Sequence, residues 1–270
     1  MTAEMPKKYW KNLPEADLIP ELILTAEARV LDMAAKAATQ PQLFHHRLQA
    51  AAAAAKPEEA LPDADTLDGL RKAACSCTLC PLHCKATQTV FGEGTAGAEI
   101  MIVGEQPGDQ EDLSGRPFVG PAGKVFDRTL SEVGIERSSL YVTNAVKHFK
   151  YELRGKKRIH QRPDAGEVER CRWWLTREID LVRPKLVVAM GATAVYALTG
   201  MKERMSDLRG RPMPLSEGRM LFVTVHPSYL LRIPDEGRRQ QEIRRFTEDM
   251  AAVRRLKEMD FGAGATGEIA

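Results

Sequence analysis

A short basic segment, RGKKRIHQRP at residues 154–163, places the imidazole of His160 among five Lys and Arg side chains. Between Lys147 and Arg162 the chain has seven Lys and Arg residues against a single acid, Glu152. Such a density of positive charge is typical of a loop that binds phosphate groups, with an affinity that falls as salt rises. Within such a loop, a neutral imidazole can contact a nucleic acid or act as a nucleophile. The segment alone leaves both roles open for His160.

A second chemical cluster lies in CSCTLCPLHC, which places Cys75, Cys77, Cys80 and Cys84 close together, while Cys171 stands alone. The N-terminus lacks the apolar segment of a signal peptide, and the sequence has no apolar run of the roughly 18 residues that span a membrane. We therefore predict a cytoplasmic protein with no membrane partner, in which thiols stay reduced. Under those conditions the cysteines are expected to bind a metal or cluster, or to remain free thiols, rather than to form disulfides.

Strand and helix patterns alternate from about residue 67 onwards. Short apolar runs rich in β-branched residues predict four strands, at 98–106, 139–148, 185–192 and 219–228. Helical patterns lie between and after them, at 123–134, 164–184, 193–200 and about 237–259. This alternation predicts an α/β fold, a three-layer α/β/α sandwich with a central four-stranded parallel sheet. The last helix interleaves arginines with acids, which is typical of a solvated face, and we interpret it as scaffold.

Polar segments follow three of the predicted strands. GEQPGDQED begins at the end of the first strand, NAVKH ends the second and HPSYLLR follows the fourth. Ligands of such sheets bind outside the carboxyl ends of the strands. The sequence therefore predicts that these segments converge on one cleft.

Composition divides the chain into three parts. Residues 1–66, rich in Ala and ending in a Pro/acidic stretch, predict a helical N-terminal extension and linker in which we find no chemistry. Residues 67–259 form the α/β domain, and 260–270 are expected to be a flexible tail. With 43% hydrophobic and 28% charged residues, the chain can bury a core of ordinary size. A net charge of +2 does not by itself indicate nucleic acid, so that inference depends on where the charges lie.

Four motifs taken in order, CTLCPLHCKATQTVFGEG, GEQPGDQED with GRPFVGPAG, VTNAVKH and VHPSYLLR, resemble those of the iron–sulfur uracil-DNA glycosylases. Within that superfamily the best match is the UdgX type, which bonds covalently to DNA and turns over once. The resemblance covers about residues 67–259 and implies the uracil-DNA glycosylase fold.

The same resemblance implies a [4Fe–4S] cluster, with Cys77, Cys80, His148 and Cys171 as its ligands. Ordinary family-four enzymes have a cysteine at this position. This chain has His148 there, and UdgX-type proteins also have a histidine. Thiolates suit iron clusters, and imidazole ligands occur in Rieske centres. Cys75 and Cys84 are left as spare thiols, either of which could replace a ligand, and a zinc site remains an alternative.

Three residues are implied to hold the base. Phe118 would stack on uracil, although core packing is the alternative for a lone Phe. The Asn144 amide can donate to a carbonyl and accept from an imide N–H, which matches the uracil edge, although an Asx turn or helix cap is as common. His226 would stabilise the departing base anion.

Other polar residues of the cleft are implied to support the reaction. Glu105 and Asp109 are candidates to orient water or to stabilise the sugar cation. Gln106, Asp112 and Ser228 are expected to contact the substrate, and Arg158 to fix the basic loop on a phosphate or on a cleft carboxylate.

The segment KRIH resembles the loop in which the UdgX-type histidine attacks the sugar. We therefore predict that the protein excises uracil from single- or double-stranded DNA, releases free uracil as product, and bonds His160 to C1′ of the abasic sugar. We expect it to act as a monomer. One alternative is a multiple-turnover glycosylase in which His160 only contacts DNA. Another is a cluster-bearing DNA-binding module without catalysis, against which Asn144, Phe118 and His226 argue.

Overall fold

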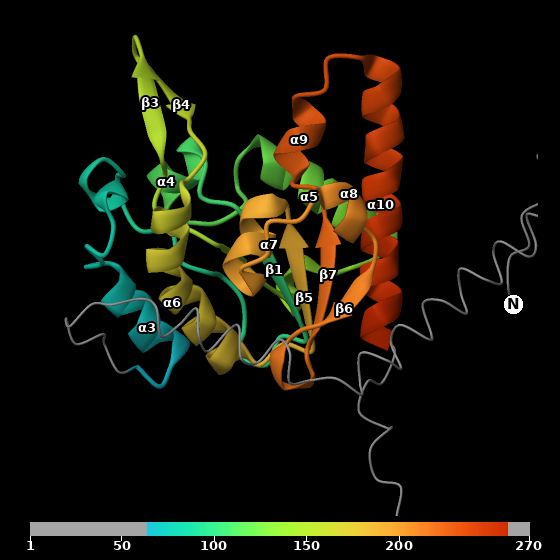
Figure 1. Ribbon diagram of the computed structural model, residues 1–270, viewed down its shortest axis with the longest axis horizontal. Helices are drawn as coiled ribbons and strands as arrows, with labels where there is room; N and C mark the ends of the chain where they lie inside the picture. The colour runs from blue at the N-terminus through green and yellow to red at the C-terminus, as the bar shows by residue number, and fades with distance from the viewer. Residues whose placement is uncertain (1–63, 259–270) are drawn as a thin grey trace, which may run out of the picture.

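The computed structural model describes residues 64–258, in which a sheet of five strands forms the centre (Figure 1). Four of the strands are parallel neighbours in the order β2, β1, β5, β7, and every residue in them is buried. Their bounds are β1 Ile100–Gly104, β2 Leu140–Asn144, β5 Leu186–Met190 and β7 Met220–Thr224. The predicted four-stranded parallel sheet is therefore confirmed. The predicted helical extension and the predicted tail lie outside the described residues, apart from 64–66.

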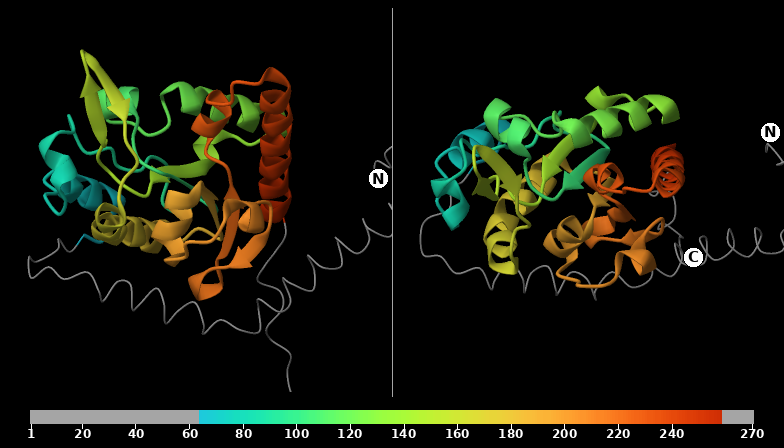
Figure 2. Two further views of the ribbon diagram at one scale, coloured as in Figure 1. Left: turned by 45° about the horizontal axis from the view of Figure 1, so that its top comes forward. Right: turned by 90° about the horizontal axis from the view of Figure 1, so that it is seen from above.

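Helices cover both faces of the sheet, as the view from above in Figure 2 shows. Alternate strand residues point to opposite faces, so that Met101 and Val103 join one core while Ile100 and Ile102 join the other. The first core is closed by α3 (Leu67–Ala74), α6 (Ala165–Val182), α7 (Ala192–Thr199) and α8 (Met205–Leu208). The second is closed by α5 (Pro121–Val133), α9 (Pro227–Leu231) and α10 (Glu236–Glu258). The predicted three layers are confirmed.

Local sequence signals set the ends of these helices. The side chain of Asp164 accepts a hydrogen bond from the Glu167 amide at 3.0 Å, and Glu167 accepts one from the Asp164 amide, which starts α6 with a capping box. Proline 121 occupies the first turn of α5, where its missing N–H costs nothing. The same helix ends at Gly134, whose φ of 71° suits a glycine C-cap.

The fifth strand, β6 (Pro212–Pro214), was absent from the sequence prediction. It pairs antiparallel with β7 at the edge of the sheet. Two of its three residues are proline, which lacks an amide donor and is tolerated in sheets only at such edges. The sheet therefore has five strands rather than four, because a strand this short and proline-rich has no recognisable periodicity.

A hairpin replaces the loop that we expected for the basic segment. Its strands β3 (Tyr151–Arg154) and β4 (Lys157–His160) pair antiparallel, with Tyr151 opposite His160. Gly155 has a φ of 60° at the turn, a conformation that favours glycine. Figure 1 shows the hairpin standing at the side of the molecule toward which the parallel strands point. The chain thus carries His160 at the base of the hairpin, next to the carboxyl ends of the sheet.

Several short elements complete the described part of the chain. They are α4 (Asp109–Ser114) and the 3₁₀ turns η2 (Pro81–Cys84), η3 (Arg137–Ser139) and η4 (Ser216–Gly218). Both α4 and α9 begin in the polar segments after β1 and β7, which sequence periodicity did not identify as helical. Among the described helices, none has the length and apolar character needed to cross a membrane.

Candidate active site

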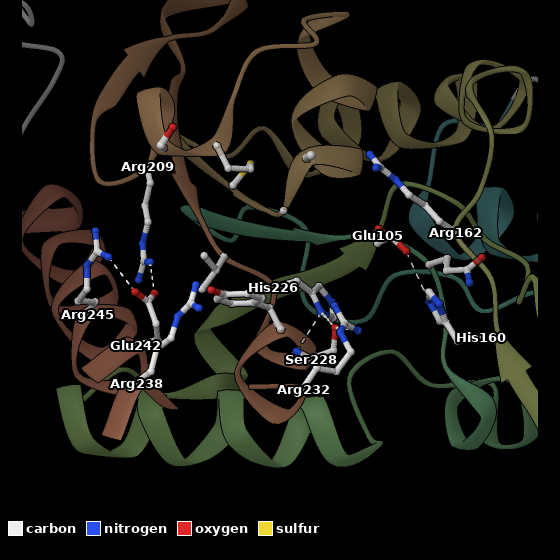
Figure 3. A pocket seen from close by; sticks show the side chains of 17 residues that line it. Glu105, His160, Arg162, Arg209, His226, Ser228, Arg232, Arg238, Glu242 and Arg245 are labelled. Atoms are coloured by element: carbon white, nitrogen blue, oxygen red, sulfur yellow. Dashed lines mark hydrogen bonds and ion pairs between the residues drawn. The ribbon is translucent and has the colours of Figure 1, made fainter. Parts of the chain in front are cut away.

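A cavity of about 740 Å³ opens beside the carboxyl ends of the strands (Figure 3). Five of the predicted site residues line it: Glu105, Gln106, His160, His226 and Ser228. They come from the segments after β1 and β7 and from β4, so that two of the three segments predicted to converge, GEQPGDQED and HPSYLLR, meet at this cavity, whereas no residue of NAVKH lines it. The structure also places Arg162, from the predicted basic loop, around this cavity together with Arg209, Arg232 and Arg238, to which sequence analysis gave no functional role.

His160 and Glu105 face each other across one end of the cavity. The His160 Nε2 atom lies 3.5 Å from Glu105 Oε1, and the His160 side chain is 43% exposed. Burial lowers the pKa of His160, the Glu105 carboxylate opposes this, and Arg232 reinforces it. The imidazole is therefore neutral at pH 7, and a neutral imidazole can act as a nucleophile.

A polar chain fixes the Glu105 carboxylate. The Thr193 hydroxyl, at the start of α7, donates to Glu105 Oε2 at 2.8 Å, and Arg162 Nε donates to the Thr193 oxygen at 3.3 Å. Sequence reasoning missed Thr193. The signal that could have found it is its place three residues after the end of β5, in the segment that begins with Gly191, since ligands bind at strand ends.

Arg158 anchors the hairpin to α4 rather than reaching a free surface. Its Nε donates to Asp109 Oδ1 at 2.5 Å and its Nη1 to Asp112 Oδ2 at 2.5 Å. Its guanidinium also lies over the Tyr151 ring, 5.2 Å from the centroid. Arg158 is predicted to bind either a phosphate or a cleft carboxylate, and the structure shows contacts with two carboxylates. It places the carboxylates of Asp109 and Asp112 on this arginine, and neither residue lines the described cavity.

Asn144 and Phe118 lie together behind the cavity. Asn144 is 1% exposed, and neither its Oδ1 nor its Nδ2 has a partner among the described residues. An unsatisfied buried amide costs about 1–3 kcal/mol, so such a group points to a ligand. Phe118 packs 5.6 Å from the His226 ring and holds a left-handed φ of 55°, which is strained for a non-glycine residue. A Cβ at Gly104 would lie 2.3 Å from Asn144 Oδ1, so only glycine leaves room there.

His226 has a defined tautomer. The Ser228 amide donates to His226 Nδ1 at 3.2 Å, which leaves the ring proton on Nε2. Burial, with smaller contributions from Arg232 and His160, lowers the pKa of His226 to about 4. The residue is thus a neutral donor at pH 7, the form required to stabilise a developing anion without first carrying a charge.

A buried ion pair supports the end of β2. Lys147 Nζ donates to Glu178 Oε2 at 2.5 Å and to the Asn144 carbonyl at 2.7 Å, and both charged side chains are no more than 1% exposed. Glu178 also accepts from the Tyr141 hydroxyl at 3.0 Å. The inclusion of Lys147 in a phosphate-binding loop was therefore wrong, because its charge is buried and balanced by Glu178. Sequence spacing could not show that a carboxylate 31 positions later reaches it.

Three of the predicted cluster ligands lie near one another. The ionisation of Cys171 is affected by both Cys80 and Cys77, and burial raises the pKa of Cys171 to about 12. Trp174 Nε1 donates to Cys77 Sγ and the Lys147 amide donates to Cys171 Sγ, each at 3.2 Å. Such N–H···S bonds suit thiolate ligands.

The fourth predicted ligand, His148, has its Nε2 at 2.9 Å from Thr89 Oγ1. No set of three or more His, Cys, Asp or Glu side chains within 64–258 converges closely enough to hold a single metal ion. Iron–sulfur clusters take thiolate ligands and, in Rieske centres, imidazole, so the chemistry of the predicted donor set suits such a group. Cys75 and Cys84 are both exposed, whereas Cys80 and Cys171 are buried and Cys77 is half-buried.

Comparison with known proteins identifies related chains. The family model of the uracil DNA glycosylase superfamily matches residues 91–251. The type-4 uracil-DNA glycosylase of Thermotoga maritima is 39% identical over 170 residues, which cover 63% of this chain and 82% of that protein. The type-4 enzyme of Saccharolobus solfataricus is 30% identical over 214 residues, covering 76% of this chain and 96% of its own. The superfamily match spans all seven described strands and therefore the loops around the cavity.

Proposed function

Since the chain belongs to the uracil-DNA glycosylase superfamily, we propose that it excises uracil from DNA and then bonds His160 to C1′ of the resulting sugar. The observation that carries the second part is the pair of His160 and Glu105, which are 3.5 Å apart in the same cavity. The base must leave the stack to reach that cavity.

Recognition of the base falls to the end of β2 and the segment before α5. The unpartnered Asn144 amide offers one donor and one acceptor to the uracil edge, and Phe118 supplies an aromatic face. As the N-glycosidic bond breaks, its electron pair leaves with the uracil. The Nε2–H of His226 then donates to the developing anion, while the Glu105 carboxylate stabilises the positive charge that remains on the sugar.

Capture of the sugar cation falls to His160. Its Nε2 lone pair forms the new bond to C1′, and the ring becomes an imidazolium whose charge the Glu105 carboxylate balances. Loss of the Nδ1 proton to water leaves a neutral N-linked imidazole, which could depart only as the strongly basic imidazolate, so the adduct persists. The alternative outcome is that Glu105 orients a water, which attacks C1′ and releases the protein from an abasic site.

We propose further that Cys77, Cys80, Cys171 and His148 hold a [4Fe–4S] cluster. When bound, this group would link the segment before η2, the segment after β2 and α6, and thereby stabilise the loop next to Asn144. The buried thiols and their N–H donors support this assignment. We also propose that the protein acts as a monomer in the cytoplasm, where reduced thiols remain available as ligands. Iron and acid-labile sulfide assays, with visible absorbance, test the cluster; a zinc-loaded, colourless protein would contradict it.

Denaturing electrophoresis with a labelled uracil-containing oligonucleotide tests the reaction. The wild type should give a band that resists detergent and heat, and peptide mapping should place the sugar on His160. His160→Ser should give no such band and should instead release an abasic site that alkali cleaves. Lys157→Ser, a change at an exposed position of the same strand, should still form the band, and thymine-containing DNA should not. An abasic product without any adduct in the wild type would leave only the glycosylase part of the proposal.

A further inference from the structure

The cavity continues well past the residues that the reaction uses. Figure 3 shows Glu105 and His160 at one end, His226 and Ser228 between, and Arg209, Arg238 and Arg245 with Glu242 at the other end. One pyrimidine base fills only a small part of about 740 Å³. The far end therefore has room for a second chemical group.

Positive charge dominates the cavity. Five arginines line it against two glutamates, the arginines being Arg162, Arg209, Arg232, Arg238 and Arg245 and the acids Glu105 and Glu242. The far end contributes three of the arginines. Arg238, Glu242 and Arg245 lie at positions i, i+4 and i+7 of α10, which puts them on one face of that helix. This face of α10 is part of the cavity, although we had interpreted the whole helix as scaffold.

Arg209 is held in a fixed orientation, and its Nη2 can still donate a hydrogen bond. Its Nε donates to Asp249 at 2.7 Å and its Nη1 to Glu242 at 2.6 Å. The side chain is 10% exposed, and its Nη2 is buried without a partner among the described residues. A buried guanidinium nitrogen that lacks a partner is costly, and two carboxylates already fix the fork. The arrangement suits an additional anionic oxygen.

We propose that this far end binds a backbone phosphate of the DNA strand, at a nucleotide beyond the one placed next to His160. The proposal rests on the proposed function, because a DNA strand that delivers a nucleotide to one end of the cavity must carry its phosphates onward. Arginine forks match phosphate oxygens in geometry as well as in charge. Arg238 and Arg245 are exposed, Arg245 pairs with Glu242 at 2.8 Å, and Arg209 is held by two carboxylates.

The test measures DNA binding without any need for excision. Binding of a labelled, uracil-free single strand is followed by fluorescence anisotropy over a series of salt concentrations. Arg238→Ala with Arg245→Ala should weaken binding by about tenfold and lower the slope of log K against log salt by about 0.7, the value for one phosphate of a single strand. The matched control is Arg244→Ala with Arg255→Ala, which removes equal charge from exposed positions of α10 outside the cavity.

Equal losses in the two double variants would overturn the proposal, since that result would indicate only a general electrostatic attraction. An unchanged affinity in the Arg238/Arg245 variant would overturn it as well. In a second measurement, uracil-containing strands are lengthened separately on the 5′ and 3′ sides. The binding defect of the Arg238/Arg245 variant should appear only once the strand exceeds a certain length, and only when it is lengthened on one side of the uracil. A defect that does not depend on strand length contradicts a distant subsite. Failure of the wild type to excise uracil would count against the proposed function alone.

Discussion

Two regions hold the proposed chemistry by different physical means. The end of β2, which presents Asn144, stands on a lysine–glutamate pair that is at most 1% exposed. The β3–β4 hairpin, which presents His160, is attached through Arg158, 17% exposed, to the buried Asp112 and to Asp109, whose side chain is 49% exposed. Water and salt do not reach the lysine–glutamate pair, whereas they compete with the contact between Arg158 and Asp109. Substitutions behind β2 should therefore act on folding, and substitutions in the hairpin on the reaction.

The largest effect is expected behind β2. Lys147→Met leaves the Glu178 carboxylate buried without its cation and should lower the free energy of unfolding by about 3–5 kcal/mol. Guanidinium unfolding of the cluster-loaded protein measures this. Replacing both partners, as in Lys147→Met with Glu178→Leu, should recover much of the loss, because no charge is then left unpaired. A loss below about 1 kcal/mol in the single variant would mean that the two regions do not differ as described.

Substitutions in the hairpin should change the rate of the reaction more than the stability of the fold. Arg158→Ala removes the link to α4, so we expect the rate of adduct formation to fall by about 10- to 100-fold because His160 is no longer held in position. The buried Asp112 keeps the Thr87 amide and hydroxyl as donors, which limits the loss of unfolding free energy to about 1–2 kcal/mol. Quenched single-turnover assays measure the rate.

Lys157→Ala is the control for this prediction, since Lys157 is an exposed residue of the same strand. If both alanine variants slow the adduct equally, the effect comes from lost charge near the DNA and not from the anchoring of the hairpin.

The two regions also differ in what the sequence could predict. The buried strands follow from continuous apolar runs, and the polar segments after them placed Glu105 and His226 at one cavity. The predicted strand 139–148 extends past the end of β2 at Asn144, because apolar residues continue where the chain leaves the sheet. The pairing of Lys147 with Glu178 was not predictable, since a lysine in a basic run gives no sign of burial. The hairpin was missed for a related reason: YELR in β3 alternates over only four residues, too few to stand out in a charged segment, and KRIH in β4 does not alternate.

The smallest expected effect is the pH dependence of the rate of adduct formation, which depends on the histidines of the cavity. The lowered pKa of His160 means that its neutral form persists below pH 6.5. An imidazole with the ordinary pKa of about 6.5 would be about three-quarters protonated at pH 6. We therefore expect the single-turnover rate of adduct formation to fall between pH 7.5 and 6 by clearly less than the roughly fourfold that an unshifted imidazole would give. A steeper fall, centred near pH 6.5, would contradict a desolvated His160.

Arg232 offers a way to sharpen this pH test, since its charge lowers the pKa of both His160 and His226. In Arg232→Ala the acidic limb of the rate profile should move to higher pH, whatever happens to the maximal rate.

The free energy of unfolding should also depend on pH through His160 and His226. Because both folded-state pKa values lie below the unfolded value, the unfolded chain takes up protons first as pH falls. Their effect on stability is absent above about pH 6.5 and becomes a growing loss from there toward pH 4, where His226 also protonates in the folded state. A pH-independent free energy of unfolding across that window would show that neither ring is shielded from water.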